Sequence, residues 1–178
     1  VFTDPPYGID YGGGRAGNHG KIQNDDLADD DLETLISGAF IARKAGGDVY
    51  VCVSPLKQQP FQNALQKHGA DIDAVIVWDK QNAGLGYHKG APYRMGDRSD
   101  FDLWSIAKDV TKDYVHPTQK PVAVPLRAIE NSSKAGDVVL DIFGGSGSTL
   151  IAAEKTGRNA RLVELDPKYC DVIVKRWQ

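Results

Sequence analysis

The residues Asp4-Pro5-Pro6-Tyr7 follow an apolar run, Val1-Phe2-Thr3. Two consecutive prolines fix the backbone φ angle and carry no N–H group, so they hold the strip rigid and present its carbonyls outward. A carboxylate and a carbonyl held side by side are two acceptors, which match the two hydrogens of a base amino group. Accepting both would turn the nitrogen lone pair toward an electrophilic methyl group, while Tyr7 stacks on the extruded base. We therefore predict that Asp4, Pro5, Pro6 and Tyr7 are catalytic, although alone they are also typical of a stiff turn.

A second segment, residues 141–149, lies between a β-rich run and a helical pattern. Its glycines let the backbone approach a ligand, and the helix N-terminus offers unpaired N–H groups. The spacing is neither G-x-G-x-x-G nor a Walker loop, and Asp141 would repel a pyrophosphate but suit an ammonium group. Glu164 ends the next strand, 17 residues after Gly147, where doubly wound folds place the carboxylate that binds ribose hydroxyls. A ligand with a ribose and an ammonium is S-adenosylmethionine; the other interpretation is a plain glycine-rich turn and a solvated Glu164.

Both segments need a sheet that brings their strand ends together. Strand patterns cover residues 1–3, 49–53, 72–78, 137–143 and 159–165, and helix patterns cover 29–44, 61–68, 121–132, 148–156 and 167–177. Asp166 is expected to cap the last helix, with Pro167 in its first turn. Residues 79–114 show little periodicity. Strands separated by helices predict an α/β fold with a doubly wound, mostly parallel sheet.

The chain resembles the amino-methylating DNA methyltransferases, the N6-adenine/N4-cytosine family, in their permuted, beta-type arrangement. Three motifs in the family's order carry the resemblance: residues 4–7, His116-Pro117-Thr118-Gln119-Lys120-Pro121, and 141–147. The resemblance covers nearly the whole chain. It implies a Rossmann-like methyltransferase fold that is circularly permuted, S-adenosylmethionine as cofactor, and double-stranded DNA as the partner, with the target base flipped out of the duplex.

The resemblance also implies site residues. Phe143, Gly144 and Gly147 would line the methionine side of the cofactor, Glu164 would bind its ribose, and residues 116–121 would flank the same pocket. The full set of residues predicted to bind the cofactor is Asp141, Phe143, Gly144, Gly145, Gly147, Glu164, His116, Thr118 and Lys120.

Asp as the first residue of the catalytic strip is usual in the family's adenine enzymes, whereas Ser is usual in its cytosine enzymes, so we expect adenine. A cytosine N4-methyltransferase would share every motif. RNA or protein-amide methyltransferases usually carry Asn at the position of Asp4. A non-catalytic subunit that binds cofactor or DNA normally loses one of the two motifs, and both are intact here. The lack of a Pro-Cys pair argues against carbon-5 chemistry.

Several residues allow two interpretations. His116 could line the pocket or begin a helix, and Lys120 could reach the cofactor carboxylate or be solvated. Asn24-Asp25-Asp26 resembles a family segment near the cofactor, but a helix-cap cluster is the favoured interpretation. Trp78 and Trp104 are expected to anchor the core or a loop rather than stack on a base.

Composition predicts one globular domain over residues 1–178, with no membrane segment and no metal site. Cys52 and Cys170 are expected to be buried free thiols of a cytoplasmic protein. The net charge is −3. Residues 80–120 contain seven Lys or Arg against five Asp, a weak basic tilt that falls short of a nucleic-acid footprint.

The chain departs from the family pattern in two places. Residues 79–115 form a shortened target-recognition or loop segment, and Tyr87-His88, Arg98 and Trp104 resemble its edges. Base reading would then fall to small loops, to a homodimer or to a specificity partner subunit, unless part of the segment is absent. The chain also begins at Val1 on a strand and ends at Gln178 before a seventh strand, so we expect a missing N-terminal portion.

Overall fold

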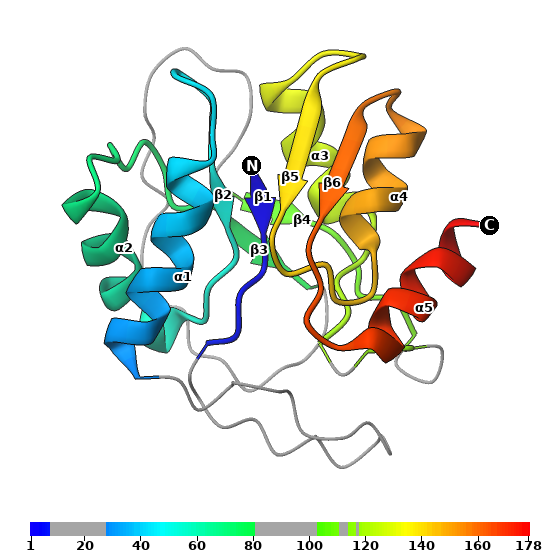
Figure 1. Cartoon of the computed structure of the whole chain (residues 1–178), viewed down its shortest axis with the longest axis horizontal. Helices are drawn as coiled ribbons and strands as arrows, with labels where there is room; N and C mark the ends of the chain where they lie inside the picture. The colour runs from blue at the N-terminus through cyan, green and yellow to red at the C-terminus, as the bar shows by residue number, and fades with distance from the viewer. Residues whose placement is uncertain (8–27, 81–102, 111–113, 117) are drawn as a thin grey trace.

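The structure, a computed structural model, describes residues 1–7, 28–80, 103–110, 114–116 and 118–178 (Figure 1). Its N-terminal elements are β1 (Phe2–Thr3), α1 (Asp29–Ile41), β2 (Tyr50–Val51), the 3-10 helix η1 (Pro55–Lys57) and α2 (Gln58–Lys67). Helix α2 begins three residues before the predicted Phe61, because η1 leads directly into it.

The remaining elements are β3 (Val77–Asp79), β4 (Leu103–Ser105), α3 (Ala123–Ser132), β5 (Val138–Asp141), α4 (Ser148–Lys155), β6 (Asn159–Leu162) and α5 (Pro167–Trp177). Helix α5 has the predicted bounds, and its cap is confirmed, since the Asp166 carboxylate accepts a hydrogen bond from the Lys168 N–H at 2.9 Å. Strand β3 is shorter than predicted and begins at Val77 instead of Ile72.

All strand pairs among the described residues are parallel: β1 with β2, β3 with β4, and β5 with β6. Strands β1 and β5 lie side by side and join the first and third pairs (Figure 1). A hydrogen bond from the Thr3 hydroxyl to the Asp141 carboxylate, 3.0 Å long, bridges the two strands. The carboxyl ends of both strands therefore meet at one edge of the sheet.

Helices cover both faces of this sheet, and strand β2 shows it most directly. Tyr50 and Cys52 pack with Val124 and Ala128 of α3. The alternate side chains, Val51 and Val53, pack with Ile36 of α1 and Phe61 of α2. Successive side chains of a strand point to opposite faces. The α/β, doubly wound, Rossmann-like fold is thus confirmed.

A third apolar cluster holds the C-terminal half together. Ile129 of α3 and Val139 of β5 are buried against Ala152 and Ala153, which are fully enclosed. Two adjacent alanines let helix α4 lie close to the sheet, so its N-terminus is positioned firmly beside the end of β5.

Strand β4 corrects the expectation that residues 79–114 are irregular throughout. Trp78 pairs with Trp104 in the parallel ladder, and Trp104 is buried in the core at 3% exposure. The strand has only three residues, so it is too short for a period-2 pattern to reveal it. The Trp78 indole N–H donates to the Ile106 carbonyl at 2.7 Å. The two tryptophans are therefore anchors, as predicted.

Both cysteines are free, as expected, but their predicted burial is only half right. Cys52 is partly buried, and burial raises the pKa of its thiol to about 12. Cys170 is exposed on α5, because it lies on the outward side of an amphipathic helix. None of the helices in the described ranges has the length and apolarity needed to cross a membrane.

Candidate active site

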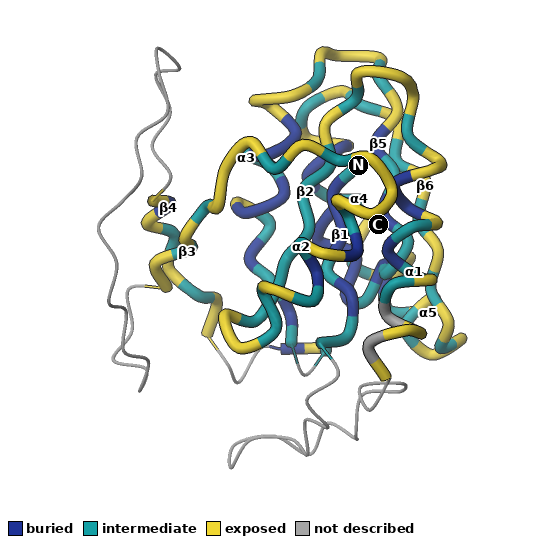
Figure 2. The backbone as a smooth tube through the Cα atoms, turned by 90° about the vertical axis from the view of Figure 1, so that its left-hand side faces the viewer, coloured by how far each residue is buried: buried dark blue, intermediate teal, exposed yellow. Residues whose placement is uncertain are grey.

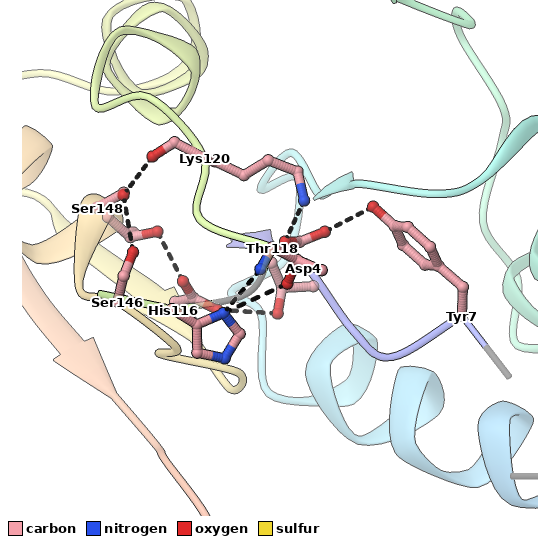
Figure 3. Close-up of polar contacts among 10 residues, drawn as sticks. Asp4, Tyr7, His116, Thr118, Lys120, Ser146 and Ser148 are labelled. Carbon is pink, nitrogen blue, oxygen red and sulfur yellow. Dashed lines mark hydrogen bonds and ion pairs between the residues drawn. The ribbon is translucent and has the colours of Figure 1, made fainter. Parts of the chain in front are cut away.

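Asp4 lies at the carboxyl end of β1, and both of its carboxylate oxygens are already bonded. The Tyr7 hydroxyl donates to Oδ1 at 2.8 Å, and the Lys120 ammonium forms an ion pair with Oδ2 (Figure 3). Pro5 is buried, which anchors the strip between these contacts. The catalytic carboxylate that the sequence predicts is therefore held in one orientation by two side chains.

Tyr7 is held from two directions. Its ring packs against the cluster of Ile36 and Phe61, while the Lys120 ammonium lies 5.7 Å from the ring centroid. The predicted stacking of Tyr7 on a base stays a prediction, but these contacts fix the ring beside Asp4.

Lys120 joins the catalytic strip to helix α4. Its side chain is 14% exposed, and its backbone carbonyl accepts a hydrogen bond from the Ser148 hydroxyl at 2.6 Å. Burial alone lowers the pKa of the ammonium, but the Asp4 charge and hydrogen bond outweigh that effect and raise the pKa overall. The solvated alternative for Lys120 is thus wrong: its ammonium is a charged partner of Asp4.

Asp141 is enclosed rather than open to a ligand, with 3% exposure. Its carboxylate accepts hydrogen bonds from the hydroxyls of Thr3 at 3.0 Å and Thr149 at 2.6 Å, and from the Phe143 N–H at 3.0 Å. Burial raises the pKa of this carboxyl to about 6, although the three hydrogen bonds act in the opposite direction. In this structure Asp141 fastens the loop to β1 and α4, and a direct contact with a ligand ammonium stays a prediction.

The glycine-rich loop is pressed against helix α5. Gly147 adopts a φ of 81°, and a Cβ there would lie 3.1 Å from Ile173 Cγ2. Gly144 meets the same side chain at 3.1 Å. The Arg176 guanidinium also donates to the Ser146 carbonyl. These contacts explain the glycines at 144 and 147 through the approach of α5, a reason that no pattern in the sequence indicates.

Glu164 lies directly beside this loop, and its role as the ribose carboxylate stays a prediction. Its Oε2 accepts from the Gly145 N–H at 2.6 Å, and its Oε1 accepts from the Asp166 N–H at 2.9 Å. A carboxylate oxygen has two lone-pair sites, so each oxygen retains capacity for one further donor.

His116 and Thr118 line the other side of the loop. The His116 ring would lie 3.9 Å from a Cβ on Gly145, and it packs edge-on against Tyr169 with centroids 4.4 Å apart. The Thr118 N–H and hydroxyl both lie 3.3 Å from His116 Nδ1. Helix α3 begins only at Ala123, so the helix-start interpretation of His116 is wrong.

The residues present fit a ligand with a ribose and an amino-acid end. Gly145 has a φ of 51° and offers backbone without a side chain, next to the Glu164 carboxylate and the His116 ring. The N-cap of α4 is Gly147, whose residue type supplies no capping side chain. The first N–H groups of this helix can therefore receive a polar ligand group.

The sequence did not single out several residues that the structure places in this site: Thr3, Ser146, Ser148, Thr149 and Tyr169. The hydroxyl residues carry no local signal, because each contributes through a partner that a sequence pattern does not record. Tyr169 could have been suspected from its place in the first turn of α5.

Some residues named in the sequence analysis lie outside the described residues: Asn24-Asp25-Asp26, Tyr87-His88, Arg98 and Pro117. No cluster of three or more metal-ligating side chains occurs within the described ranges.

Comparisons with known proteins point to one class of protein, the DNA methyltransferases. Residues 89–175 match the family model of the N6/N4 DNA methylases. The type II methyltransferase M.HinfI of Haemophilus influenzae is 34% identical over 131 residues, which cover 67% of this chain but only 36% of that protein. M2.DpnII of Streptococcus pneumoniae, also a type II methyltransferase, is 27% identical over 216 residues, covering 99% of this chain and 81% of its own length.

Solved structures show the same fold. The M1.HpyAVI–SAM complex superposes with a TM-score of 0.70 at 21% identity, over 98% of this chain and 86% of that chain. A candidate DNA modification methylase from Thermus thermophilus, complexed with S-adenosyl-L-methionine, gives 0.66 at 25% identity, over 99% and 84%. The cytosine-N4-specific PvuII DNA methyltransferase gives 0.73 at 16% identity, over 99% and 78%.

A doubly wound parallel sheet with these two strand-end segments is the Rossmann-like fold of S-adenosylmethionine-dependent methyltransferases. Within that class, the chain is similar to the amino-methylating DNA methyltransferases, the N6-adenine/N4-cytosine family, whose model matches its residues 89–175.

Proposed function

We propose that this chain transfers a methyl group from S-adenosylmethionine to the exocyclic amino group of adenine in double-stranded DNA. One observation carries the proposal: the strip around Asp4 is tied to the glycine-rich loop by two separate routes. Lys120 connects Asp4 to Ser148, and Asp141 connects Thr3 to Thr149. A catalytic strip and a cofactor loop that share contacts in this way form one site.

The chain's own residues would position the base. With the base extruded, Asp4 and a carbonyl of the proline strip would accept the two hydrogens of its amino group, leaving the nitrogen lone pair free. Tyr7 and Lys120 hold the Asp4 carboxylate still, so little reorganisation accompanies the reaction. When bound, S-adenosylmethionine supplies the electrophilic methyl group.

We assign the cofactor to the loop beside β5. Glu164 would accept hydrogen bonds from the ribose hydroxyls, and Phe143, Gly144, Gly145 and Gly147 would surround the methionine end. His116 and Thr118 would close the opposite side, since His116 lies next to Gly145. The catalytic strip precedes the cofactor loop along the chain, and we propose that this order reflects the permuted, beta-type arrangement of the family.

The substitution Asp4→Ala tests the catalytic assignment. We expect methyl transfer to fall by at least about 10²-fold, because an acceptor for the reacting amino group is lost. Calorimetry should show S-adenosylmethionine binding close to that of the unmodified protein, since Asp4 is not assigned to the cofactor. Asp71→Ala, which removes an exposed carboxylate, is the matched control. Retained activity in Asp4→Ala would refute the role of Asp4.

A cytosine N4-methyltransferase is the second candidate, because the cytosine-N4-specific PvuII enzyme shares the fold with a TM-score of 0.73. Asp at position 4 supports adenine. Mass spectrometry of nucleosides from DNA treated with the protein distinguishes N6-methyladenine from N4-methylcytosine. Cofactor binding without either product would instead favour a non-catalytic subunit.

The names of the type II relatives support a place in restriction–modification, where a partner subunit or a second copy would complete sequence recognition.

A further inference from the structure

Two lysines follow the carboxyl ends of the paired strands β3 and β4. Asp79 pairs with Ser105 in the parallel register, and the Ile106 N–H donates to the Asp79 carbonyl at 3.0 Å. Lys80 and Lys108 therefore emerge at the same edge of this strand pair. Figure 2 shows β3 and β4 at one side of the molecule.

Aromatic rings support both lysines. The Lys80 ammonium lies 5.1 Å from the centroid of Trp78, whose indole is fixed to Ile106. The Lys108 ammonium lies 5.8 Å from the centroid of Tyr114, which is buried. Cation–π contacts restrict where these flexible side chains place their charges.

The carboxyl ends of β3 and β4, with Lys80 and Lys108, form a basic corner that lies close to the candidate active site. Burial lowers the pKa of Lys80, and the neighbouring charges of Lys108 and Lys120 lower it further, while Asp4 opposes them. Trp78 and Ile106, which precede these lysines in the chain, pack against the same apolar cluster as Phe2 of β1, so the two lysines follow strands that lie next to the strand leading to Asp4.

Within the described ranges, Lys80 and Lys108 have no carboxylate partner, whereas Lys120 is paired with Asp4. The nearby Asp109 carboxylate accepts from the Gln119 amide at 3.2 Å, and the Asp79 carboxylate accepts from the Ser105 hydroxyl at 3.1 Å. The Tyr114 hydroxyl is buried and lacks a hydrogen-bond partner among the described residues. Among the described residues, Lys80 and Lys108 thus have no ion-pair partner and the Tyr114 hydroxyl is a spare donor, and an anionic oxygen would satisfy these groups.

We propose that Lys80 and Lys108 bind a phosphodiester of the DNA strand next to the extruded base. The proposal rests on the proposed function, which makes DNA the substrate. A base enters the site from a backbone that must stay outside it, so a phosphate next to that base has to pass close to the strip around Asp4. Lysines there hold the backbone without reading sequence.

Salt-dependent DNA binding tests this proposal with the double variant Lys80→Met/Lys108→Met. A fluorescent duplex is titrated at several salt concentrations between about 50 and 200 mM, in the presence of S-adenosylmethionine. The control, Lys67→Met/Lys155→Met, removes the same charge from exposed positions on α2 and α4. Each phosphate contact contributes about 0.9 to the slope of log K against log salt.

We expect the double variant to lower the magnitude of that slope by about 1, the contribution of one phosphate, and to weaken DNA binding roughly tenfold or more at low salt. The control should keep the original slope, and Lys80→Arg/Lys108→Arg should restore most of the affinity. S-adenosylmethionine affinity, measured by calorimetry, should stay within about twofold in all variants, because neither lysine is assigned to the cofactor.

Three outcomes would overturn the proposal: an unchanged slope in the double variant, an equal loss in the control, or a large loss of S-adenosylmethionine affinity. The last would assign the two lysines to the cofactor. If the unmodified protein itself fails to bind DNA, the proposed function fails as well, so the two failures are distinguishable.

Discussion

At the scale of single residues, the pair of Lys120 and Asp4 is the centre of the site. The two residues are 116 positions apart, and both side chains are largely buried. A buried charge whose partner is removed is strongly unfavourable, so the ammonium and the carboxylate depend on each other. We therefore regard Lys120 as a positioning residue for Asp4, rather than as the cofactor contact that the family resemblance implies.

Substitution of Lys120 tests this assignment. Lys120→Met should reduce kcat for methyl transfer by up to about 10²-fold through misplacement of Asp4, and Lys120→Arg should retain more activity because it keeps the charge. S-adenosylmethionine affinity should change little. Lys67→Met, which breaks the exposed pair with Glu33, is the control. A loss confined to cofactor affinity, with kcat preserved, would show that Lys120 serves the cofactor instead.

At the scale of elements, helix α5 determines the shape of the glycine-rich loop. Ile173 packs against Gly144 and Gly147, and Arg176 bonds to the Ser146 carbonyl. The loop is thus held between the end of β5 and the last helix of the described chain.

Two glycine substitutions separate backbone strain from packing. Gly136→Ala introduces a side chain at a φ of 86° in open space, so it should cost about 1 to 2 kcal/mol of stability. Gly147→Ala has a similar φ but meets Ile173 at 3.1 Å, so it should cost about 1 to 3 kcal/mol more. Urea denaturation measures both. Equal losses in the two variants would mean that α5 does not constrain the loop.

The junction of β1, β5 and α4 predicts a pH effect through Asp141. Its pKa is raised from the ordinary 3.8 to about 6 in the folded protein, so the folded state binds this proton more tightly than the unfolded state. The Asp141 contribution therefore makes the fold less stable as pH rises from about 4 to 6, by roughly 3 kcal/mol in total, and levels off above that.

Comparison with Asp141→Asn isolates that contribution, because the amide does not titrate. The difference in unfolding free energy between the two proteins should shift in favour of Asp141→Asn as pH rises from about 4 to about 6. Denaturation series at several pH values measure it. A difference that stays constant over this range would contradict the raised pKa.

At the scale of the whole molecule, the two halves of the sheet meet where β1 and β5 lie side by side, and the candidate site lies at that junction (Figure 1). Glu164 connects β6, the loop and the start of α5 through two backbone hydrogen bonds. A cofactor that spans these parts should stabilise the entire fold, since it binds the folded state alone.

Glu164→Ala tests this link. The unmodified protein should gain about 2.7 kcal/mol of stability when S-adenosylmethionine is present at about 100 times its Kd. The variant should bind the cofactor roughly 10- to 100-fold more weakly, because hydrogen bonds to a charged group are lost, and its thermal shift should shrink accordingly. Asp4→Ala should keep the full shift. An undiminished shift in Glu164→Ala would refute its role.

The sequence alone was sufficient for the features that depend on local order. The alternation of strands and helices, the capping of α5 by Asp166, and the two strand-end segments all follow from residue types within a few positions of each other. These patterns predicted the fold class, and the motifs predicted the family. The sequence patterns did not predict strand β4, because three residues are too few for a periodic signal.

Only the tertiary structure decided how these segments work together. The pair of Lys120 with Asp4, the enclosure of Asp141 by Thr3 and Thr149, and the approach of α5 to the glycines join residues that no local pattern connects. Likewise, a count of charges between residues 80 and 120 shows only a weak basic tilt. Folding brings Lys80 and Lys108 to the catalytic edge, because parallel strands end together there and no pattern within the chain records which strand ends meet.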